Sequence, residues 1–358
     1  MQKSQAIFVS GTAKQVLPTK SNPGVAMRLF EALSNLDFQI GENPNSPYFI
    51  AINHNPKDYS RFIRSGGTPK NAILIRREPQ AVHPIQYQRA MENRYGLILS
   101  PGAVAEIQKR EVLLNTPYAI SANPNSLSFS DQSIRNVLSS RGFAEIFTLE
   151  HWHKRKYFVT LFASNKVSPS KRQNYSVRRK IVKMHGDEIE VFGQLWSAST
   201  LSQISYRTRV LIFSLRSGYF PSLKSIYGSM FHKYPDCHGI FEDKFAITRN
   251  TQFSLVIEND STCITEKLFD AFFSGNIPIY FGPDLAQYGI PDELYVRMKE
   301  DFNSSLLEIR GFDDMEIQKR LSAIFSYISA PDFYQKWSDE RVFASIAQEI
   351  HQYIRESS

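Results

Sequence analysis

Short apolar runs alternate with amphipathic stretches along the first part of the chain. Runs of mainly apolar residues are typical of buried strands, and they occur at 6–10, 48–53, 72–75 and 97–100. Turn sequences (NPKD, REPQ and SPGA) follow the last three. Helical patterns fill residues 25–36 and 84–93 between them. Strands that alternate with helices predict a parallel, layered α/β domain.

A second series of the same kind begins near residue 157. Strands are expected at 157–164, at 253–257, at 277–281 and, more briefly, just before Gly193. Helices are expected at 175–185, 201–214, 222–232, 265–274 and from 315 onward.

This pattern predicts three parts in the chain. An N-terminal α/β domain covers residues 1–155, a second α/β domain covers 156–335, and a C-terminal helix over 336–358 packs on the body. Ligands of open α/β sheets bind at the carboxyl ends of the strands. We therefore expect two similar domains that face each other across a ligand-binding cleft.

Composition fits this organisation. The 358 residues suggest two or three domains of roughly 100–200 residues. With 42% hydrophobic and 22% charged residues, the chain lies well away from disordered sequences. Cys237 and Cys263 are the only cysteines, so at most one disulfide can form and a reducing compartment is the simpler interpretation.

Charge and hydropathy narrow the class of protein further. No apolar run approaches the about 18 residues that a membrane span needs, and the first residues lack the apolar region of a signal peptide. The net charge of +7 suggests anionic partners. Nucleotide phosphates, nucleic acid and an anionic membrane surface all remain open on this ground.

The segment 253–283 contains the most informative chemistry. Its first strand ends at Glu258 and Asn259, where an α/β sheet binds ligand. Thr265 is the expected N-cap of the next helix, whose free N–H groups and dipole favour an anion. Lys267 adds a charge for phosphate, and Glu266 could accept hydrogen bonds from a ribose diol. A first-turn glutamate also stabilises any helix, so a structural role is equally open.

Three segments, in chain order, resemble the family 10 glycosyltransferases, the α-1,3/1,4-fucosyltransferases. They are SNKVSPSKRQNY at 164–175 running into EVFGQ at 190–194, ENDSTCITEKLFDAFFSGNIPIYFG at 258–282, and IPDELYVRMKEDFNSSLLEI at 290–309. The resemblance is to the short bacterial members and covers the second predicted domain. The N-terminal half resembles the family only loosely.

The resemblance implies a GT-B fold and an inverting transfer of L-fucose from GDP-β-L-fucose to a glycan hydroxyl. It implies no obligatory cofactor, with Mn²⁺ or Mg²⁺ at most stimulating the reaction. By analogy with bacterial members, we expect a cytoplasmic enzyme of cell-surface polysaccharide or lipopolysaccharide assembly. Its acceptor would be a free or lipid-linked glycan, which allows peripheral association with the inner face of the membrane.

Site residues follow from the matched motifs. Arg172 is expected to neutralise the departing diphosphate together with Lys267, because guanidinium grips phosphate in a bidentate fashion. The remaining expected donor contacts are Asn165, Gly193, Glu258, Asn259, Thr265 and Glu266. The other basic residues of the run 171–183 are interpreted as surface residues.

The general base should be a carboxylate at a strand end of the first domain. Glu78 fits, since it follows the strand at 72–75 and the family has a catalytic glutamate in a comparable context. Glu42 in GENPN is an alternative, and His54 in INHNP is a candidate acceptor contact.

Two other hypotheses remain beside this one. The same fold could use a different nucleotide sugar, because Cys263 stands where family members often have an aromatic residue. A basic nucleic-acid-binding protein is a remote alternative suggested by HWHKRKYF, although its last residues already belong to a predicted core strand. No spacing of His, Cys or acidic residues indicates a metal site, and no P-loop or GxGxxG is present.

Overall fold

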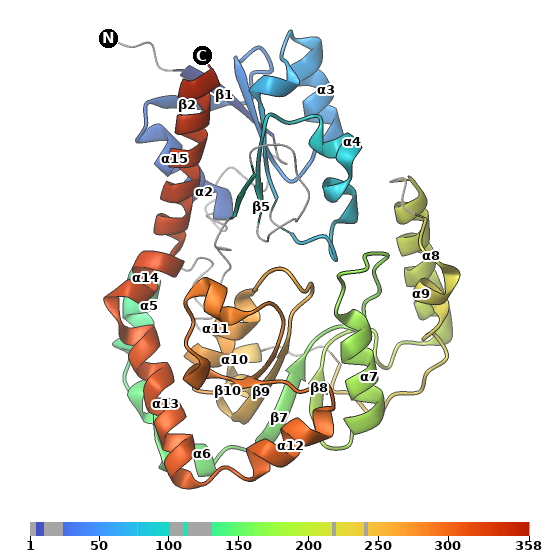
Figure 1. Ribbon diagram of the computed structural model, residues 1–358, viewed down its shortest axis with the longest axis vertical. Coiled ribbons are helices and arrows are strands. Elements are labelled where there is room, and N and C mark those ends of the chain that lie inside the picture. Colours follow the sequence, from blue (N-terminus) through green and yellow to red (C-terminus); the bar gives the residue numbers. More distant parts are fainter. Residues whose placement is uncertain are drawn as a thin grey trace. The chain divides into compact units, whose positions relative to one another are not determined.

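The computed structural model describes residues 5–10, 24–76, 78–100, 111–113, 131–216, 220–239 and 243–357 (Figure 1). The chain divides into two compact units. The first contains residues 1–119, 125–133 and 334–358, and the second contains 120–124 and 134–333.

The second unit begins before the boundary that we expected near residue 155. The reason is a buried arginine at that position. The Arg155 guanidinium donates hydrogen bonds to the carbonyl oxygens of Thr251 (2.9 Å) and Gly275 (2.7 Å), and the Trp152 ring packs edge-on against Phe253. These contacts tie the preceding short helices to the second sheet, so they fold with it.

The first unit is built on a six-stranded sheet with the order β2-β1-β3-β4-β5-β6. Every pairing in it is parallel. The strands are β1 (Gln5–Ser10), β2 (Phe38–Gly41), β3 (Tyr48–Ile52), β4 (Ala72–Ile75), β5 (Leu97–Ser100) and β6 (Glu111–Leu113).

Helices cover both faces of this sheet, as a parallel sheet requires. The helices of this unit are α2 (Gly24–Ser34), α3 (Pro56–Arg64), α4 (Arg89–Glu92) and α15 (Asp339–Ser357), with 3₁₀ turns η1 (Pro69–Asn71) and η2 (Pro84–Tyr87). Successive side chains point to opposite faces of the sheet. Ile73 belongs to the core under α2 and α15, whereas Leu74 belongs to the core under α3 and α4.

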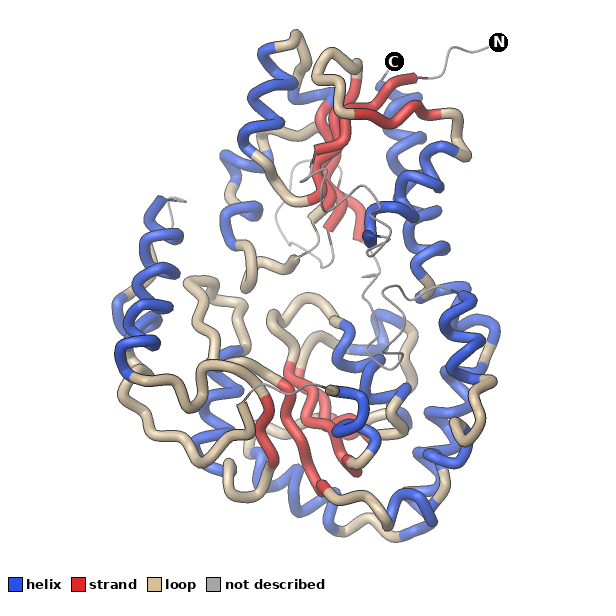
Figure 2. Tube along the Cα trace, turned by 180° about the vertical axis from the view of Figure 1, so that it is seen from behind, coloured by secondary structure: helices blue, strands red, loops and turns tan. Residues whose placement is uncertain are grey.

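The second unit has a five-stranded sheet with the order β11-β10-β9-β7-β8, again entirely parallel (Figure 2). Its strands are β7 (Tyr157–Phe162), β8 (Glu190–Phe192), β9 (Thr251–Ile257), β10 (Ile277–Phe281) and β11 (Val296–Arg297). The expectation of two parallel-sheet α/β domains is therefore confirmed.

Helices and 3₁₀ turns make up most of the rest of the chain. The helices are α5 (Asp131–Leu138), α6 (Leu149–His153), α7 (Tyr175–His185), α8 (Thr200–Arg216), α9 (Leu223–Tyr227), α10 (Lys244–Arg249), α11 (Glu266–Phe273), α12 (Phe302–Arg310), α13 (Asp314–Ser329) and α14 (Pro331–Trp337). The 3₁₀ turns are η3 (Ala144–Phe147), η4 (Leu285–Tyr288) and η5 (Asp292–Leu294). Both α10 and α11 pack against β9. These two helices frame the segment in which the sequence placed most of the candidate chemistry.

Candidate functional site

The carboxyl ends of β7, β8 and β9 meet at one edge of the second sheet, because all of its strands are parallel. The loops that leave this edge, together with the first turn of α11, contain every residue of the second unit that the sequence proposed. Asn165 follows β7, Gly193 follows β8, and Glu258 with Asn259 follows β9. Open α/β sheets bind their ligands at this edge.

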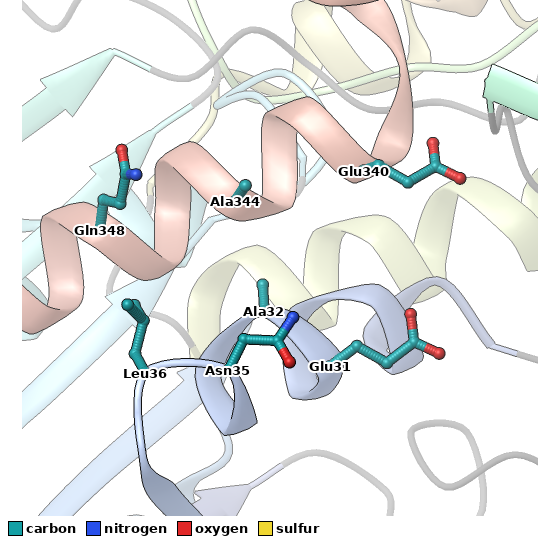
Figure 3. A pocket seen from close by; sticks show the side chains of 7 residues that line it. All are labelled: Glu31, Ala32, Asn35, Leu36, Glu340, Ala344 and Gln348. Carbon is teal, nitrogen blue, oxygen red and sulfur yellow. The ribbon is translucent and has the colours of Figure 1, made fainter.

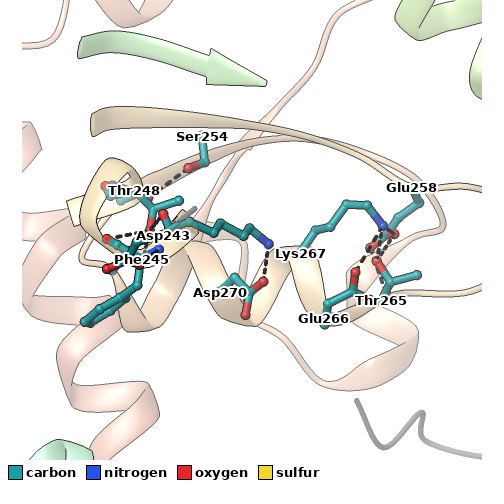
Figure 4. Close-up of polar contacts among 12 residues, drawn as sticks. Asp243, Phe245, Thr248, Ser254, Glu258, Thr265, Glu266, Lys267 and Asp270 are labelled. Atoms are coloured by element: carbon teal, nitrogen blue, oxygen red, sulfur yellow. Dashed lines mark hydrogen bonds and ion pairs between the residues drawn. The ribbon is translucent and has the colours of Figure 1, made fainter. Parts of the chain in front are cut away.

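Glu258 is the centre of a buried hydrogen-bond network at the start of α11 (Figure 4). Its side chain is fully buried and accepts hydrogen bonds from the Thr265 backbone N–H (2.8 Å) and the Thr265 hydroxyl (2.5 Å). Burial raises the pKa of Glu258, although the nearby Lys267 ammonium opposes that shift. The carboxylate thus fixes the N-cap of α11 rather than facing solvent.

Lys267 and Glu266 reach the surface from this buried network. The Lys267 Nζ donates to the Thr265 hydroxyl oxygen (2.9 Å) and lies 3.9 Å from Glu258 Oε2 and 3.6 Å from Glu266 Oε1. The side chain of Lys267 is 16% exposed and that of Glu266 is 30% exposed. Burial opposes ionisation of Glu266, but the ammonium groups of Lys267 and Lys244 outweigh it, so its pKa is lowered.

A second cluster of polar contacts, around Asp243 and Asp270 in Figure 4, connects α11 to α10. The Asp243 carboxylate caps α10 by accepting from the backbone N–H of Phe245 (2.8 Å), and Lys244 forms an ion pair with Asp270 of α11. Because Asp270 is buried, this pair fixes α10 to α11. The position of Glu266 and Lys267 is therefore determined from both sides.

The turn that contains Arg172 is hydrogen-bonded to the loop after β9. The backbone N–H of Ser261 donates to Arg172 O (3.1 Å), and that of Asn174 donates to Asn259 O (3.1 Å). A short antiparallel bridge lies between these two bonds. Two segments more than eighty residues apart are thereby joined at the edge of the sheet. Arg172 itself is half-buried, so its side chain retains exposed surface.

Arg178 is a residue whose place the sequence did not reveal. We interpreted it as a surface arginine of a basic run, but it is 3% exposed, and that interpretation is wrong. Its guanidinium donates to Asn259 Oδ1 (2.9 Å) and to the backbone carbonyl of Ile257, where β9 ends. Burial lowers its pKa. Arg179 is also buried and donates to the carbonyl of Lys166.

Asn165 and Gly193 lie together at the ends of β7 and β8. The Asn165 side chain is buried and donates to Leu195 O (3.3 Å), while its backbone N–H donates to Gln194 O (2.9 Å). Gly193 has φ +149°, and a β-carbon there would lie 2.1 Å from the Ala163 carbonyl oxygen. Only glycine permits this close approach, so both residues shape the loops of this edge.

A pocket of about 560 Å³ opens beside these loops. Part of its lining comes from the ends of β7 and β8 and part from α8. The residues that line it are Ser164, Lys166, Gln194, Leu195, Leu201, Ser202, Ser205, Tyr206 and Arg209. Two of them are cations and none is acidic, so the pocket suits an anionic ligand.

In the first unit, Glu78 and His54 lie at the ends of neighbouring strands. Glu78 is half-buried beyond β4, and His54 follows β3. The backbone N–H of Asn53 donates to Ile75 O (2.8 Å), which joins the two strand ends. Glu42 is exposed beyond β2, the outermost strand of the sheet, so it is separated from this pair by β1.

His54 is held in its neutral form. Its Nδ1 lies 2.5 Å from the hydroxyl of Tyr95, and burial, aided by the charge of Arg94, lowers its pKa to about 4. Beneath this edge Arg76 is fully buried, with its guanidinium 2.8 Å from Glu92 Oε1 and 3.0 Å from the Ser100 hydroxyl. A neutral imidazole at neutral pH can accept or donate a hydrogen bond without adding charge.

A second pocket in the described part of the chain is less suited to phosphate. A smaller pocket of about 270 Å³ lies between α2 and α15, and Figure 3 shows carboxylates of Glu31 and Glu340 among the residues around it. No cation lines it, so it does not suit phosphate. Across the described ranges, no three His, Cys, Asp or Glu side chains gather as metal ligands would. Within those same ranges, every helix is too short or too polar to span a bilayer.

Sequence comparisons give no family for this chain. No protein-family model matches it, and a search of curated proteins gave no significant match. Solved structures, in contrast, resemble it over nearly its whole length.

One crystal structure of an α1,3-fucosyltransferase is similar to this chain, with TM-score 0.51 and 13% sequence identity. The alignment covers 99% of this chain and 90% of the fucosyltransferase chain. The complex of an α1,3-fucosyltransferase with GDP-fucose matches 100% and 92%, with TM-score 0.51 and 14% identity. HepE from Anabaena, in complex with UDP and glucose, matches 98% and 100%, with TM-score 0.51 and 8% identity. The chain therefore has the GT-B fold that these glycosyltransferases share.

Proposed function

We propose that this protein is an inverting glycosyltransferase, an α-1,3-fucosyltransferase that moves L-fucose from GDP-β-L-fucose to a hydroxyl of a glycan. The observation that carries this proposal is the junction at the edge of the second sheet. There the turn of Arg172 is hydrogen-bonded to the loop between β9 and α11. The same loop leads to Glu266 and Lys267 at the start of α11, where the two side chains lie 3.6 Å apart.

In the donor site, the charges of this junction would divide between diphosphate and ribose. Arg172 and Lys267 would neutralise the diphosphate, helped by the N-terminal N–H groups of α11. Glu266 would accept hydrogen bonds from the ribose hydroxyls, since its lowered pKa keeps it ionised at neutral pH. Glu258 would not touch the donor, because it is fully buried; it positions Thr265 and Lys267.

For the chemical step, we propose Glu78 as the general base. It would take the proton from the acceptor hydroxyl as that oxygen forms a bond to the anomeric carbon of fucose. The bond between this carbon and the diphosphate oxygen breaks on the opposite face, and the diphosphate leaves with the electron pair. Attack on the face opposite the leaving group inverts the configuration. His54, at the neighbouring strand end, is the proposed acceptor contact, and Glu42 is the alternative carboxylate.

A different nucleotide-sugar donor is the second candidate. It is supported by HepE, whose crystal structure contains UDP and glucose and whose TM-score of 0.51 equals that of the fucosyltransferase complex. Cys263, which stands where the fucosyltransferases often have an aromatic residue, is fully buried. It could not contact a donor in this conformation. The three fucosyltransferase-like segments of the sequence favour GDP-fucose over this alternative.

The biological setting is also a proposal. The acceptor would be a free or lipid-linked glycan of cell-surface polysaccharide or lipopolysaccharide assembly, and the enzyme would work in the cytoplasm, peripherally at the membrane. No metal would be obligatory, although Mn²⁺ or Mg²⁺ could stimulate by binding the diphosphate.

The test is calorimetric binding of GDP, UDP, CMP and ADP to the purified chain, first without metal and then with Mn²⁺. Selective, metal-independent binding of GDP supports the fucosyltransferase and justifies an acceptor screen with GDP-fucose. A preference for UDP or CMP retains glycosyl transfer but rejects fucose. If no nucleotide binds, the proposed donor site is refuted.

A further inference from the structure

In helix α8 several polar residues are buried and several apolar residues are exposed. Its fully buried residues include Arg207 and Ser214, and Gln203 is 5% exposed. By contrast, Ile204 is 39% and Leu215 is 45% exposed. An amphipathic helix of a globular protein normally has the opposite arrangement.

Hydrogen bonds help to hold α8 against α9 and the turn that follows it. The Arg207 guanidinium donates to the carbonyl of Ile226 and to the hydroxyl of Ser229 (3.3 Å). The hydroxyls of Thr208 and Tyr227 are 2.9 Å apart. Beside these polar contacts, several apolar side chains of the two helices remain exposed, whereas Ile226 of α9 is fully buried. Figures 1 and 2 show the pair at the periphery of the second unit.

Exposed apolar side chains are concentrated in this region. Of the eleven large hydrophobic side chains that are exposed in the described part of the chain, eight lie between residues 201 and 231. On α8, Ile204, Ile212 and Leu215 share one face, given the helical period. Leu223 of α9 is 64% exposed, and Phe231 is 77% exposed. A concentration of exposed apolar side chains of this kind is typical of an interaction site.

The charge of the same segment is entirely positive. Residues 191–235 contain no Asp or Glu. Besides the buried Arg207, four basic residues lie on or beside α8 and α9, namely Arg209, Arg216, Lys224 and Lys233. The side chains of Arg209, Lys224 and Lys233 are exposed. Apolar side chains surrounded by cations are typical of surfaces that lie in the interface of an anionic membrane.

We propose that this surface, the α8–α9 face, docks on an anionic lipid bilayer. It comprises Ile204, Ile212, Leu215, Leu223 and Phe231, with Lys224 and Lys233 beside them. Apolar side chains enter the boundary between headgroups and acyl chains, and the two lysines remain at the phosphates. The proposal concerns a surface and does not depend on the donor or on the reaction.

Two other occupants fit the face less well. A second copy of this chain, related by a twofold axis, would bring like charges together with no carboxylate of the segment to compensate them. Nucleic acid would satisfy the cations, but exposed Ile and Leu side chains offer it neither stacking nor hydrogen bonds. A bilayer accommodates both the charge and the aliphatic surface.

The test is flotation of the full chain with vesicles of 30% phosphatidylglycerol in phosphatidylcholine, against vesicles of pure phosphatidylcholine. We expect partitioning at least about tenfold stronger onto the anionic vesicles, because each lysine near such a surface contributes about fivefold. The double variant Ile212→Ser/Leu215→Ser should weaken it at least about tenfold, and Lys224→Glu/Lys233→Glu should abolish the preference for anionic lipid.

Matched controls use residues of the same kind elsewhere in the second unit. Leu307 and Met315 are 60% and 79% exposed, so Leu307→Ser/Met315→Ser should leave partitioning within about twofold of wild type. Lys154→Glu/Lys319→Glu reproduces the charge change at lysines whose side chains are 70% exposed. Circular dichroism and GDP binding verify that each variant is folded.

Several outcomes would overturn the proposal. The first is that the chain floats with neither kind of vesicle. The second is that the face variants and the control variants lose partitioning to the same extent. The third is that the chain partitions equally onto both lipid compositions. A concentration-dependent mass that the Ile212→Ser/Leu215→Ser variant abolishes would assign the face to a second copy. Binding to oligonucleotides that outcompetes the vesicles would assign it to nucleic acid.

Discussion

The carboxyl edges of the two sheets use charge in different ways. At the second sheet, Glu258, Thr265 and Lys267 form one hydrogen-bonded network, and Arg178 is bound to Asn259 in the loop after β9. At the first sheet, His54 is kept neutral and Glu78 is only half-buried. The difference teaches that the charged groups of one edge are fixed by buried partners, whereas the other edge has a neutral imidazole and a half-buried carboxylate at neighbouring strand ends.

Removing the centre of the second-sheet network gives the largest expected effect. Glu258→Ala leaves the Thr265 N–H and hydroxyl without their acceptor and Lys267 without its buried countercharge. We expect the free energy of unfolding of the second unit to fall by about 3–5 kcal/mol. Urea unfolding monitored by tryptophan fluorescence measures it.

Glu150→Ala is the control for this substitution, because Glu150 forms an ion pair with Lys154 that is exposed on both sides. It should leave the unfolding transition nearly unchanged. If Glu258→Ala unfolds like wild type, the network does not fix the edge, and the contrast between the sheets fails.

A substitution at the edge of the first sheet should lower turnover without weakening donor binding. If Glu78 is the general base, Glu78→Gln lowers turnover with GDP-fucose at least about 100-fold, because the amide cannot take a proton. GDP binding, followed by calorimetry, should be unchanged. Glu42→Gln is the matched control at the outermost strand. A loss confined to Glu42→Gln would move the base to that residue.

A substitution at the edge of the second sheet should weaken the affinity for GDP. Arg172→Ala removes one charged hydrogen-bonding partner of the diphosphate, so GDP binding should weaken by about 10–150-fold. Lys171 precedes it in the chain and is exposed, and Lys171→Ala should bind GDP nearly as wild type does. Equal affinity of the Arg172 variant and wild type, measured by calorimetry, would separate this turn from the donor.

The most gradual expected effect is a dependence of the free energy of unfolding on pH in the first unit. The pKa of His54 is about 4 in the folded chain and near 6.5 when exposed, so the unfolded state takes up a proton first. The contribution of neutral His54 to the free energy of unfolding is fully present above pH 6.5 and is lost as the pH falls toward 4. The slope is at most about 1.4 kcal/mol per pH unit.

His54→Asn should reduce this slope, whereas His153→Asn, at a side chain that is 54% exposed, should leave it unchanged. Thermal unfolding between pH 4 and 7 distinguishes them. An unaltered slope in His54→Asn would show that burial does not hold this imidazole neutral.

The sequence predicted those parts of the structure that depend on neighbours in the chain. Alternation of strands and helices gave both sheets, and β4 matches the predicted strand at 72–75. Thr265, Glu266 and Lys267 could be placed together because they are consecutive at a helix start. Arg172 was associated with them only through the family resemblance, since its turn is bonded to the loop after β9, more than eighty residues along the chain.

Long-range contacts explain what the sequence did not predict. Arg178 binds a carbonyl 79 residues away, and nothing near it in the chain distinguishes it from a solvated arginine. The helical period predicted α8, but not that Arg207 would face inward, since its partners Ile226 and Ser229 lie in α9 and in the turn after it. The sequence also does not show that Arg155 is tied to β9 and to the loop before β10.

The return of the chain to its first unit has a consequence for synthesis. Seven residues of α15, from Val342 to Ile354, belong to the core beneath one face of the first sheet, together with α2. Until α15 has left the ribosome, α2 covers that face without it and this core is incomplete. The second unit is complete by residue 333 and can fold as it emerges. The half of the protein that is translated first is therefore the half that finishes folding last.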